Sequence, residues 1–408
     1  MKKNIFTYLK GDRIIWIVIG VFAIFSMLAV YSASVSLAYK YQGGNTFYYF
    51  LKHGLILFIS FIVIYFLHNR PYRIFLIWSK PLFLLSIPLL VITLAFGSSL
   101  NEASRWIAIP FIGLTIQTSD FAKIALIMYL AKLLAQKQKN DEIKRLKDGF
   151  GPLIIPILLT VALIFPANLS TAALVFTVSL ILLFIGQVKF VHIISLIAII
   201  LVFGFSFIFI GSHYLKHSRV ATWKNRIEQF WNHDEVVDES KNFQANQAKI
   251  AIATAGIMGK GPGNSTQKNI LPHPYSDFIF AIIVEEYGLI GAILLIGFYL
   301  ILIYRSIVIV KKSTSYFASF LTIGLTLLIS MQAFINIGVA INLFPVTGQT
   351  LPLISMGGTS LIFTSSAIGM ILSISRSVIQ GEKADTKKDE KQDISNNINQ
   401  DTENESIN

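Results

Sequence analysis

The sequence predicts an all-α protein that crosses a membrane about ten times. Its composition, the length of its apolar segments and the placement of its positive charges support this fold class. The chain has 408 residues, of which 54% are hydrophobic and 14% are charged, whereas roughly 25% of the residues in a soluble domain are charged. A water-soluble fold could not bury so much apolar sequence, because much of any folded surface must face water.

The apolar segments have the length of membrane spans or come close to it, since about 20 helical residues cross the hydrocarbon core. In chain order they are residues 14–30, 51–67, 82–96, 118–134, 153–165, 171–185, 190–210, 278–303, 317–339 and 351–374. The fifth and sixth segments are short, and residues 166–170 form a tight joint between them. These segments predict the helices of the bundle.

Lys and Arg occur mainly in alternate connections between these segments, which the positive-inside rule places in the cytoplasm. The connections predicted to be cytoplasmic contain Arg70, Arg73, Lys80, Lys137, Lys139, Lys144, Arg145, Lys147, Lys189, Arg305, Lys311 and Lys312. The short outer connections contain little beyond Lys40, Lys52 and Arg105. An even number of spans then predicts both termini in the cytoplasm of a bacterial inner-membrane protein.

The chain divides into a membrane domain, residues 1–380, and a polar tail, residues 381–408. The domain contains a long outer segment at about 211–277, between the seventh and eighth spans. A loop of this length in a compact bundle is usually functional, so we expect the chemistry there. The tail is rich in Asn, Asp, Lys and Glu, and it cannot bury enough apolar surface to become ordered.

Several classes of site are excluded or disfavoured. The absence of cysteine excludes disulfides, thiolate catalysis and Cys-ligated zinc. The net charge of +12 follows the membrane topology and does not indicate nucleic-acid binding. The glycine-rich turn at 259–265 lacks the Gly-Lys-Ser/Thr ending of a nucleotide-binding loop, although its backbone N–H groups could approach another substrate. His213 and His217 lack the intervening glutamate of a zinc-protease helix.

Charged residues within the apolar segments need a partner or a function. Asp120 and Lys123 are three residues apart on one predicted helix face, which fits either a structural ion pair or a polar cavity in which Lys123 meets an anionic group. Glu285 and Glu286 lie about 12 Å along the eighth span from Asp277, at about 1.5 Å per residue. They fit either structural anchors or a cavity lining.

Asp277 ends a segment stiffened by two prolines and opens the eighth span. One interpretation is a helix cap, because free N–H groups and the helix dipole stabilise a carboxylate there. The other is a general base at the mouth of a cavity, which takes a proton from a substrate hydroxyl.

Three groups of motifs, in the same order along the chain, resemble those of the SEDS family (shape, elongation, division and sporulation). The first is Ser104-Arg105-Trp106-Ile107 followed by Gln117-Thr118-Ser119-Asp120-Phe121-Ala122-Lys123. The second is Asn264-Ser265-Thr266-Gln267-Lys268 followed by Ser276-Asp277-Phe278 and Glu285-Glu286-Tyr287-Gly288. The third is Pro345-Val346-Thr347-Gly348 followed by Ile354-Ser355-Met356-Gly357-Gly358. The second group, with Phe230-Trp231-Asn232, is more similar to division-type than to elongation-type members.

The sequence departs from the family pattern at three places. Asp120 stands where a glutamate is usual, Asn168 stands where an aspartate is usual, and Met356 replaces a common aromatic residue. Asp277 matches the essential outer aspartate of the family.

The resemblance implies an inverting peptidoglycan glycosyltransferase that polymerises lipid II, an undecaprenyl-linked disaccharide-pentapeptide, at the outer face of the membrane during cell division. Asp277 would be the catalytic base. The substrate-binding set would comprise Arg105, Asp120, Lys123, Arg226, Ser265, Gln267, Lys268, Glu285, Thr347 and Ser355. Cationic stabilisation of the pyrophosphate would come from Lys123, Arg105, Arg226 or Lys268, or from a divalent cation, Mg²⁺ or Mn²⁺.

The implied partners are a class B penicillin-binding protein (a transpeptidase) and other division proteins. Two functions of other classes stay open. A lipid II transporter would use the intramembrane charges as a polar path, and a non-catalytic scaffold would only organise the division complex.

Overall fold

The computed structural model describes residues 9–100, 103–108, 115–140, 143, 145, 149–214, 239–272 and 274–381. Each apolar segment predicted from the sequence contains a helix. These helices are α1 (Arg13–Ala33), α3 (Thr46–His68), α4 (Arg73–Phe96), α5 (Thr118–Lys139), α6 (Gly151–Ile164), α7 (Leu169–Ile185), α8 (Phe190–Tyr214), α11 (Ile279–Lys312), α12 (Tyr316–Ala340) and a last helix, Thr359–Gly381. The predicted polytopic helical fold is therefore confirmed.

Six of these helices are long and apolar enough to cross a membrane, namely α1, α3, α4, α11, α12 and the last helix. Shorter apolar helices occur at Gly151–Ile164, Leu169–Ile185 and Phe190–Val202. The number of spans stays a prediction. The last helix begins at Thr359, so the predicted start at residue 351 is wrong. Residues 351–358 instead form turns that contact several helices.

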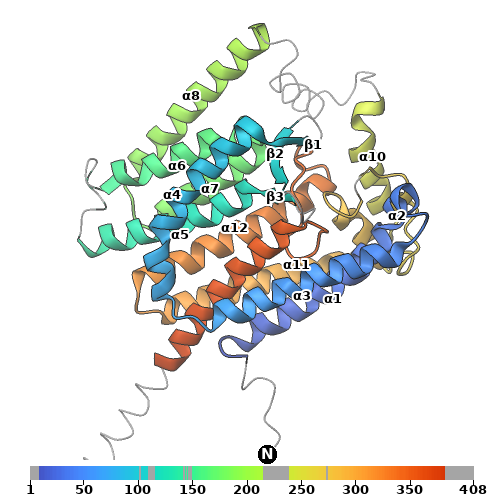
Figure 1. The fold of residues 1–408 in the computed structure, drawn as a ribbon, viewed down its shortest axis with the longest axis horizontal. Helices are drawn as coiled ribbons and strands as arrows, with labels where there is room; N and C mark the ends of the chain where they lie inside the picture. The colour runs from blue at the N-terminus through green and yellow to red at the C-terminus, as the bar shows by residue number, and fades with distance from the viewer. Residues whose placement is uncertain are drawn as a thin grey trace, which may run out of the picture.

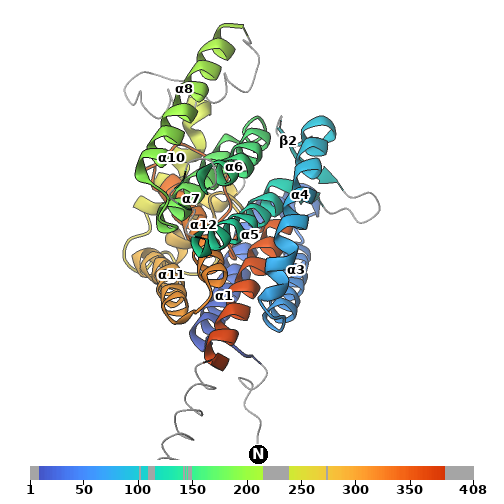
Figure 2. The ribbon, with the colours of Figure 1, turned by 90° about the vertical axis from the view of Figure 1, so that its left-hand side faces the viewer.

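The helices form a bundle with α12 near its centre (Figure 1 and Figure 2). The helix α12 packs against α5, α7 and α11, and α1 packs against α3 and α11. The burial of the side chains agrees with this arrangement: 67% of the most apolar stretch of α12 is buried, compared with 22% of that of α3. The helix α3 therefore presents apolar side chains outward, as expected for contact with lipid. The helix α8 leans away from the bundle at the top of Figure 1.

Short elements gather at one end of the bundle. They are α2 (Val35–Tyr41), α10 (Glu239–Ala253), the 3₁₀ turn η3 (Gln267–Asn269) and the strands β1 (Ser98–Leu100), β2 (Ala103–Ala108) and β3 (Thr115–Gln117). The strands form an antiparallel sheet in the order β1-β2-β3. The sequence predicted neither this sheet nor α10, because both are short and lie in connections between apolar segments.

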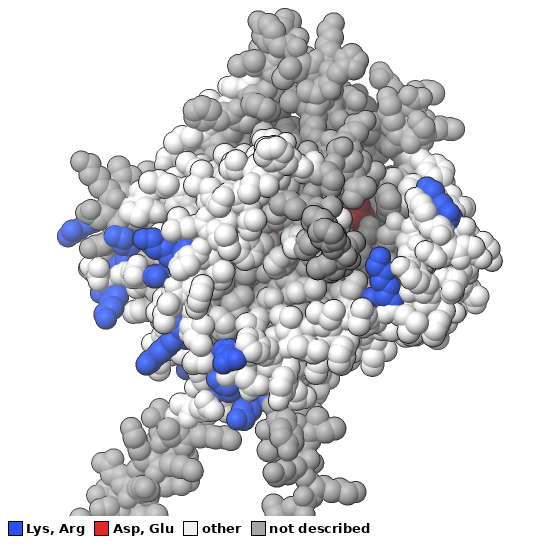
Figure 3. Space-filling view, in the orientation of Figure 1, with Lys and Arg blue, Asp and Glu red and all other residues white. Residues whose placement is uncertain are grey.

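The opposite end of the bundle is basic. Lys and Arg gather at the left and lower edge of Figure 3, where α1 begins and the last helix ends (Figure 1). Asp12 accepts hydrogen bonds from the backbone N–H groups of Ile14 (2.9 Å) and Ile15 (3.2 Å) and so caps α1. It also accepts from Arg305 Nε at 2.8 Å, which ties the start of α1 to α11. Lys and Arg residues of the connections predicted to be cytoplasmic thus lie together at one end of the bundle.

Candidate functional site

The backbone around Asp277 is fixed by hydrogen bonds from a distant part of the chain. Three consecutive carbonyl oxygens, those of residues 275–277, each accept one bond. The donors are the Met356 N–H, 2.9 Å from the Tyr275 oxygen, the Ser355 hydroxyl, 2.7 Å from the Ser276 oxygen, and the Asn336 amide, 2.8 Å from the Asp277 oxygen. The position of Asp277 is therefore set by α12 and by the connection that follows it.

Asp277 is not the cap of α11. The N-cap residue is Phe278, with φ −112° and ψ 18°, and α11 has no side-chain cap. The Ser276 hydroxyl lies 3.2 Å from Asp277 Oδ1 and donates to it, and the side chain is half-buried. The helix-cap interpretation is therefore wrong.

Tyr275 lies beside this carboxylate. Burial raises the pKa of its hydroxyl, and the charges of Tyr41, Asp277 and Tyr49 raise it further. A raised pKa keeps the tyrosine protonated at neutral pH. The site therefore combines a carboxylate with a neutral phenol.

Asn336 and Gln349 connect the Asp277 segment with α7. The Asn336 amide donates to the Gln349 backbone oxygen at 2.6 Å as well as to Asp277. The Gln349 amide in turn donates to Thr171 Oγ1 at 2.7 Å. Asn168 caps α7, since its side-chain oxygen accepts from the Thr171 N–H at 3.2 Å.

Asp120 and Lys123 form the ion pair predicted from their spacing, with Lys123 Nζ 2.8 Å from Asp120 Oδ1. Both side chains are buried. Lys123 also donates to Gln332 Oε1 at 2.8 Å, and the Gln332 amide donates to the Thr350 backbone oxygen at 2.9 Å. The pair is thus part of a network that holds the connection between α12 and the last helix.

Glu285 is surrounded by donors from the turn at 259–268. Its oxygens accept from Lys260 Nζ at 2.5 Å, from the Ser265 hydroxyl, from the hydroxyl and N–H of Thr266 (2.8 and 3.2 Å) and from the Gln267 N–H (3.2 Å). Its side chain is fully buried. Of the two interpretations of Glu285, the contacts fit the structural anchor.

Glu286 also accepts hydrogen bonds from the fold, and one of its donors lies on α1. Its carboxylate accepts from the Ser32 hydroxyl and from the Ser265 N–H, the latter at 3.4 Å. Lys268 Nζ lies 2.5 Å from the Gly263 backbone oxygen and 3.5 Å from Ser32 Oγ. These contacts attach the glycine-rich turn to the end of α1.

The N–H groups of the glycine-rich turn are used by the fold. Those of Lys260 and Gly261 donate to the backbone oxygens of Glu285 (2.9 Å) and Glu286 (3.0 Å). The expectation that they approach a substrate is therefore wrong at these two positions. The turn instead supplies hydrogen bonds at the point where α11 is broken, since Gly288 has φ 67° and ψ −166°.

Two glycines allow this close approach. A Cβ at Gly259 would lie 2.3 Å from the Glu286 backbone oxygen, and a Cβ at Gly288 would lie 2.2 Å from the Ile257 backbone oxygen. Any other residue would push the backbones apart. Both glycines also have positive φ, a region that L-residues rarely adopt.

The remaining predicted site residues are placed less fully. Arg105 lies in β2, and only its backbone is described. Arg226 lies outside the described residues. Thr347 is half-buried in the connection after α12. Ser355 both donates to Ser276 and accepts from the Leu351 N–H at 2.7 Å, so its hydroxyl is engaged by protein; substrate binding by these four residues stays a prediction.

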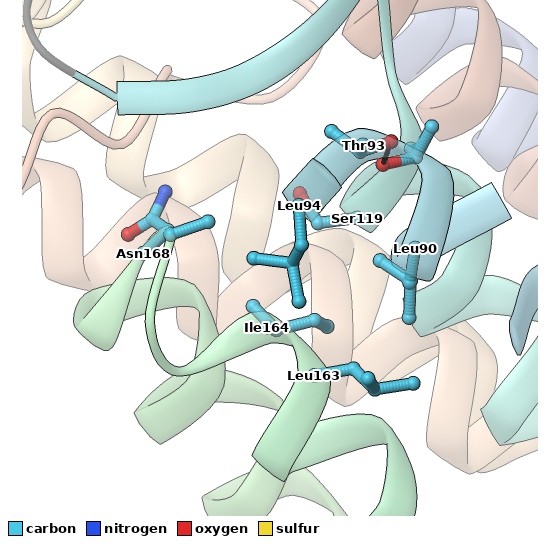
Figure 4. Close-up of a pocket in the computed structure, with 9 residues that line it drawn as sticks. Leu90, Thr93, Leu94, Ser119, Leu163, Ile164 and Asn168 are labelled. Carbon is cyan, nitrogen blue, oxygen red and sulfur yellow. Dashed lines mark hydrogen bonds between the residues drawn. The ribbon is translucent and has the colours of Figure 1, made fainter. Parts of the chain in front are cut away.

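A small recess opens near the start of α5. Figure 4 shows Ser119, Thr93 and the Asn168 amide above the apolar side chains of Leu163 and Ile164. The hydroxyls of Thr93 and Thr118, which also line the recess, are hydrogen-bonded to each other at 2.8 Å. Asp277 does not line the recess, which is small for a ligand pocket, so it is not assigned to the reaction.

Among the described residues, no group of three or more His, Asp or Glu side chains has the arrangement of a metal site. A divalent cation would therefore need ligands from its substrate or from other residues of the outer segment. The cation proposed from the sequence stays a prediction.

The fold and the site define a class of protein. The chain is a polytopic helical membrane protein whose residues 12–380 match the model of a family described as cell cycle protein, the FtsW/RodA/SpoVE family. The match covers most of the chain, and the chain belongs to this family. The resemblance inferred from the three groups of motifs is thereby confirmed.

Particular relatives share most of the chain. It is 32% identical over 376 residues to "Probable peptidoglycan glycosyltransferase FtsW" of Trichlorobacter lovleyi, covering 91% of this chain and 94% of that protein. It is 33% identical over 355 residues to "Stage V sporulation protein E" of Bacillus subtilis, covering 86% and 93%. A chain from a solved peptidoglycan synthase complex, described as coordinating polymerization and crosslinking, has a TM-score of 0.72 at 22% identity and covers 91% and 99%. This last similarity supports the fold.

Proposed function

We propose that this protein is a peptidoglycan glycosyltransferase that polymerises lipid II during cell division. Membership of the family and the names of its relatives support the activity. The observation that carries the mechanism is the attachment of the backbone of residues 275–277 by three bonds, one to each carbonyl oxygen, from residues that follow Asp277 by at least 59 positions. A general base needs this kind of fixed geometry within reach of the proton that it abstracts.

Asp277 takes the proton of the acceptor sugar 4-hydroxyl. The hydroxyl oxygen attacks the anomeric carbon of the donor, a new C–O bond forms, and the bond to undecaprenyl pyrophosphate breaks with the electron pair on the leaving oxygen. One base and an anion-stabilising group suffice for this inverting transfer. Arg105, Arg226, Lys268 or a divalent cation would stabilise the leaving pyrophosphate.

Lys123 has a different role in this mechanism. Its ammonium group is buried and already bonded to Asp120 and Gln332. We assign it to the support of residues 349–350, which lie beside Asn336 and so beside the Asp277 segment. A buried ion pair that also organises a hydrogen-bond network is costly to break.

The site faces the outside of a bacterial inner membrane, at the division site, and the basic end of the bundle faces the cytoplasm. The chain contains no cysteine, so single cysteines introduced at Asn264 and at Lys312 can be labelled selectively. A membrane-impermeant maleimide should label Asn264→Cys in intact spheroplasts and label Lys312→Cys only after lysis. The reverse pattern would contradict an outer active site.

The partner is a class B penicillin-binding protein that cross-links the strands, with other division proteins attached to the complex. The resemblance to a chain of a peptidoglycan synthase complex supports such an assembly. The polar tail predicted at residues 381–408 lies, after Gly381, outside the described residues.

The test is polymer formation from purified lipid II by the protein in complex with its transpeptidase. The native complex should produce glycan strands, and the complex with Asp277→Asn should not. Strands made at the native rate by Asp277→Asn would refute the proposed base. Headgroup movement across sealed vesicles without polymer would favour the transporter, and neither activity in the native complex would favour the scaffold.

A further inference from the structure

Asn336 links the Asp277 segment with the connection that follows α12. It lies on α12, its side chain is 1% exposed, and its amide donates both to the Asp277 backbone oxygen (2.8 Å) and to the Gln349 backbone oxygen (2.6 Å). Asn336 was not among the site residues predicted from the sequence. Its signal in the sequence was a polar residue in an apolar span. It lies four residues after Gln332 and so on the same helix face.

Asn336 donates to the Asp277 carbonyl oxygen, which lies just before the first backbone hydrogen bonds of α11. The first backbone bonds of α11 are accepted by the Phe278 oxygen, from the N–H groups of Ala281 (3.0 Å) and Ile282 (3.4 Å). The Asp277 carbonyl therefore precedes the ladder of α11. Asn336 supplies its donor from another helix, and this fixes the peptide plane from which the Asp277 side chain projects.

The chemistry of the amide matches this role. A planar NH₂ group offers two N–H donors in fixed directions, whereas aspartate at the same size offers only acceptors at neutral pH. Asn336 Oδ1 is buried and has no partner among the described residues. Burying a polar group in this way costs stability, so the two donated bonds, more than general packing, account for an amide at this position.

We propose that Asn336 is a positioning residue for the Asp277 base. The inference rests on the proposed function, because it assigns Asn336 an effect on the rate only through Asp277. Loss of the amide removes a donor from the Asp277 carbonyl and from the Gln349 carbonyl together. The carboxylate then moves relative to the acceptor hydroxyl, and a displacement of about 1 Å at a reacting group can cost on the order of 10² in rate.

The experiment measures lipid II polymerisation kinetics of Asn336→Ala in the purified complex with the transpeptidase. We expect kcat per folded protein to fall about 10- to 100-fold and KM to stay within about twofold of native. The matched control is Ser330→Ala, which removes a buried hydroxyl of the same helix that has no partner among the described residues. The control should retain native kcat and KM.

A second measurement separates positioning from a structural role. With a positioning role, proton transfer becomes slower in Asn336→Ala, so its solvent deuterium isotope effect on kcat should exceed that of the native complex. A merely structural role would lower the amount of active protein and leave KM and the isotope effect unchanged. If Asn336→Ala is not recovered as monodisperse protein, Asn336→Gln, which keeps the donors but displaces them by one methylene, should show the same kcat loss and isotope effect.

The outcomes are distinguishable. Native kcat in Asn336→Ala with an inactive Asp277→Asn complex would overturn the positioning role alone. A rise in KM at native kcat would also overturn it, since that indicates direct substrate contact. Native activity of Asp277→Asn would instead overturn the proposed base on which the inference rests.

Discussion

Two carboxylates near the start of α11 are held in opposite ways. Glu285 is held through its side chain, whose oxygens accept from Lys260, Ser265, Thr266 and Gln267. Asp277, eight residues earlier, is held through its backbone, since the donors from Asn336 and the following connection reach carbonyl oxygens. The comparison indicates that the Glu285 carboxylate serves the fold, whereas the three bonds from distant residues at 275–277 reach backbone oxygens, and the Asp277 carboxylate accepts from its neighbour Ser276.

The largest effect is expected at Asp277. Asp277→Asn keeps the size of the side chain and the backbone bonds but removes the base, so the rate of polymerisation should fall about 10²–10⁴-fold. The melting temperature of the purified protein should stay close to native, because the bonds from Asn336 and Ser355 reach backbone oxygens and the amide oxygen can still accept from the Ser276 hydroxyl. A large loss of stability would show that the carboxylate, like that of Glu285, serves the fold.

Glu285→Gln should show the opposite pattern. The substitution removes the negative charge facing Lys260 and weakens charge-assisted bonds to the turn, which are each worth roughly 1.5–3 kcal/mol. The melting temperature should fall clearly, while kcat per folded protein should change by less than about tenfold. Glu285→Gln with native stability and no activity would assign Glu285 to the reaction.

Gly288→Ala tests the contact between the broken helix and the glycine-rich turn. The backbone conformation at Gly288 and the 2.2 Å approach of its Cβ position to the Ile257 oxygen predict a loss of about 1–3 kcal/mol. Gly297→Ala is the matched control in the same helix, because its Cβ would meet no atom within 4 Å. Equal stability of the two variants, measured by thermal unfolding, would contradict the described kink.

Tyr275→Phe should have the smallest effect. The raised pKa of Tyr275 means that the folded protein binds its proton more tightly than the unfolded chain does. The contribution of Tyr275 to the free energy of unfolding is therefore present at neutral pH and is lost only as the pH rises above the ordinary tyrosine pKa of about 10. Activity profiles of native protein and Tyr275→Phe between pH 6 and 9 should have the same shape and differ by less than about tenfold; a new basic limb in the native profile alone would contradict this.

The helices could be predicted from the sequence for a physical reason. A bilayer requires about 20 consecutive apolar residues for each span, and this signal is local. The spacing of Asp120 and Lys123 placed them on one helix face and allowed either an ion pair or a polar cavity; the structure contains the ion pair. Asp277 was selected because prolines and a span boundary flank it and because it matches the aspartate of the family motif; its role as the base stays a prediction.

The partners of these residues could not be predicted in the same way. Lys123 is separated from Gln332 by 209 residues, and Asp277 from Asn336 by 59. No periodicity encodes such contacts. The role of the glycine-rich turn was missed because the break of α11 at Gly288, which the turn satisfies, has no counterpart in a hydropathy pattern.

The most direct test is a paired measurement of kcat per folded protein and of melting temperature for Asp277→Asn and Glu285→Gln, in the same complex and detergent. The proposed roles predict a crossed result: Asp277→Asn loses the rate and keeps the melting temperature, while Glu285→Gln loses melting temperature and keeps most of the rate. Parallel losses of rate and stability in both variants would contradict the distinction between a carboxylate held for chemistry and one used by the fold.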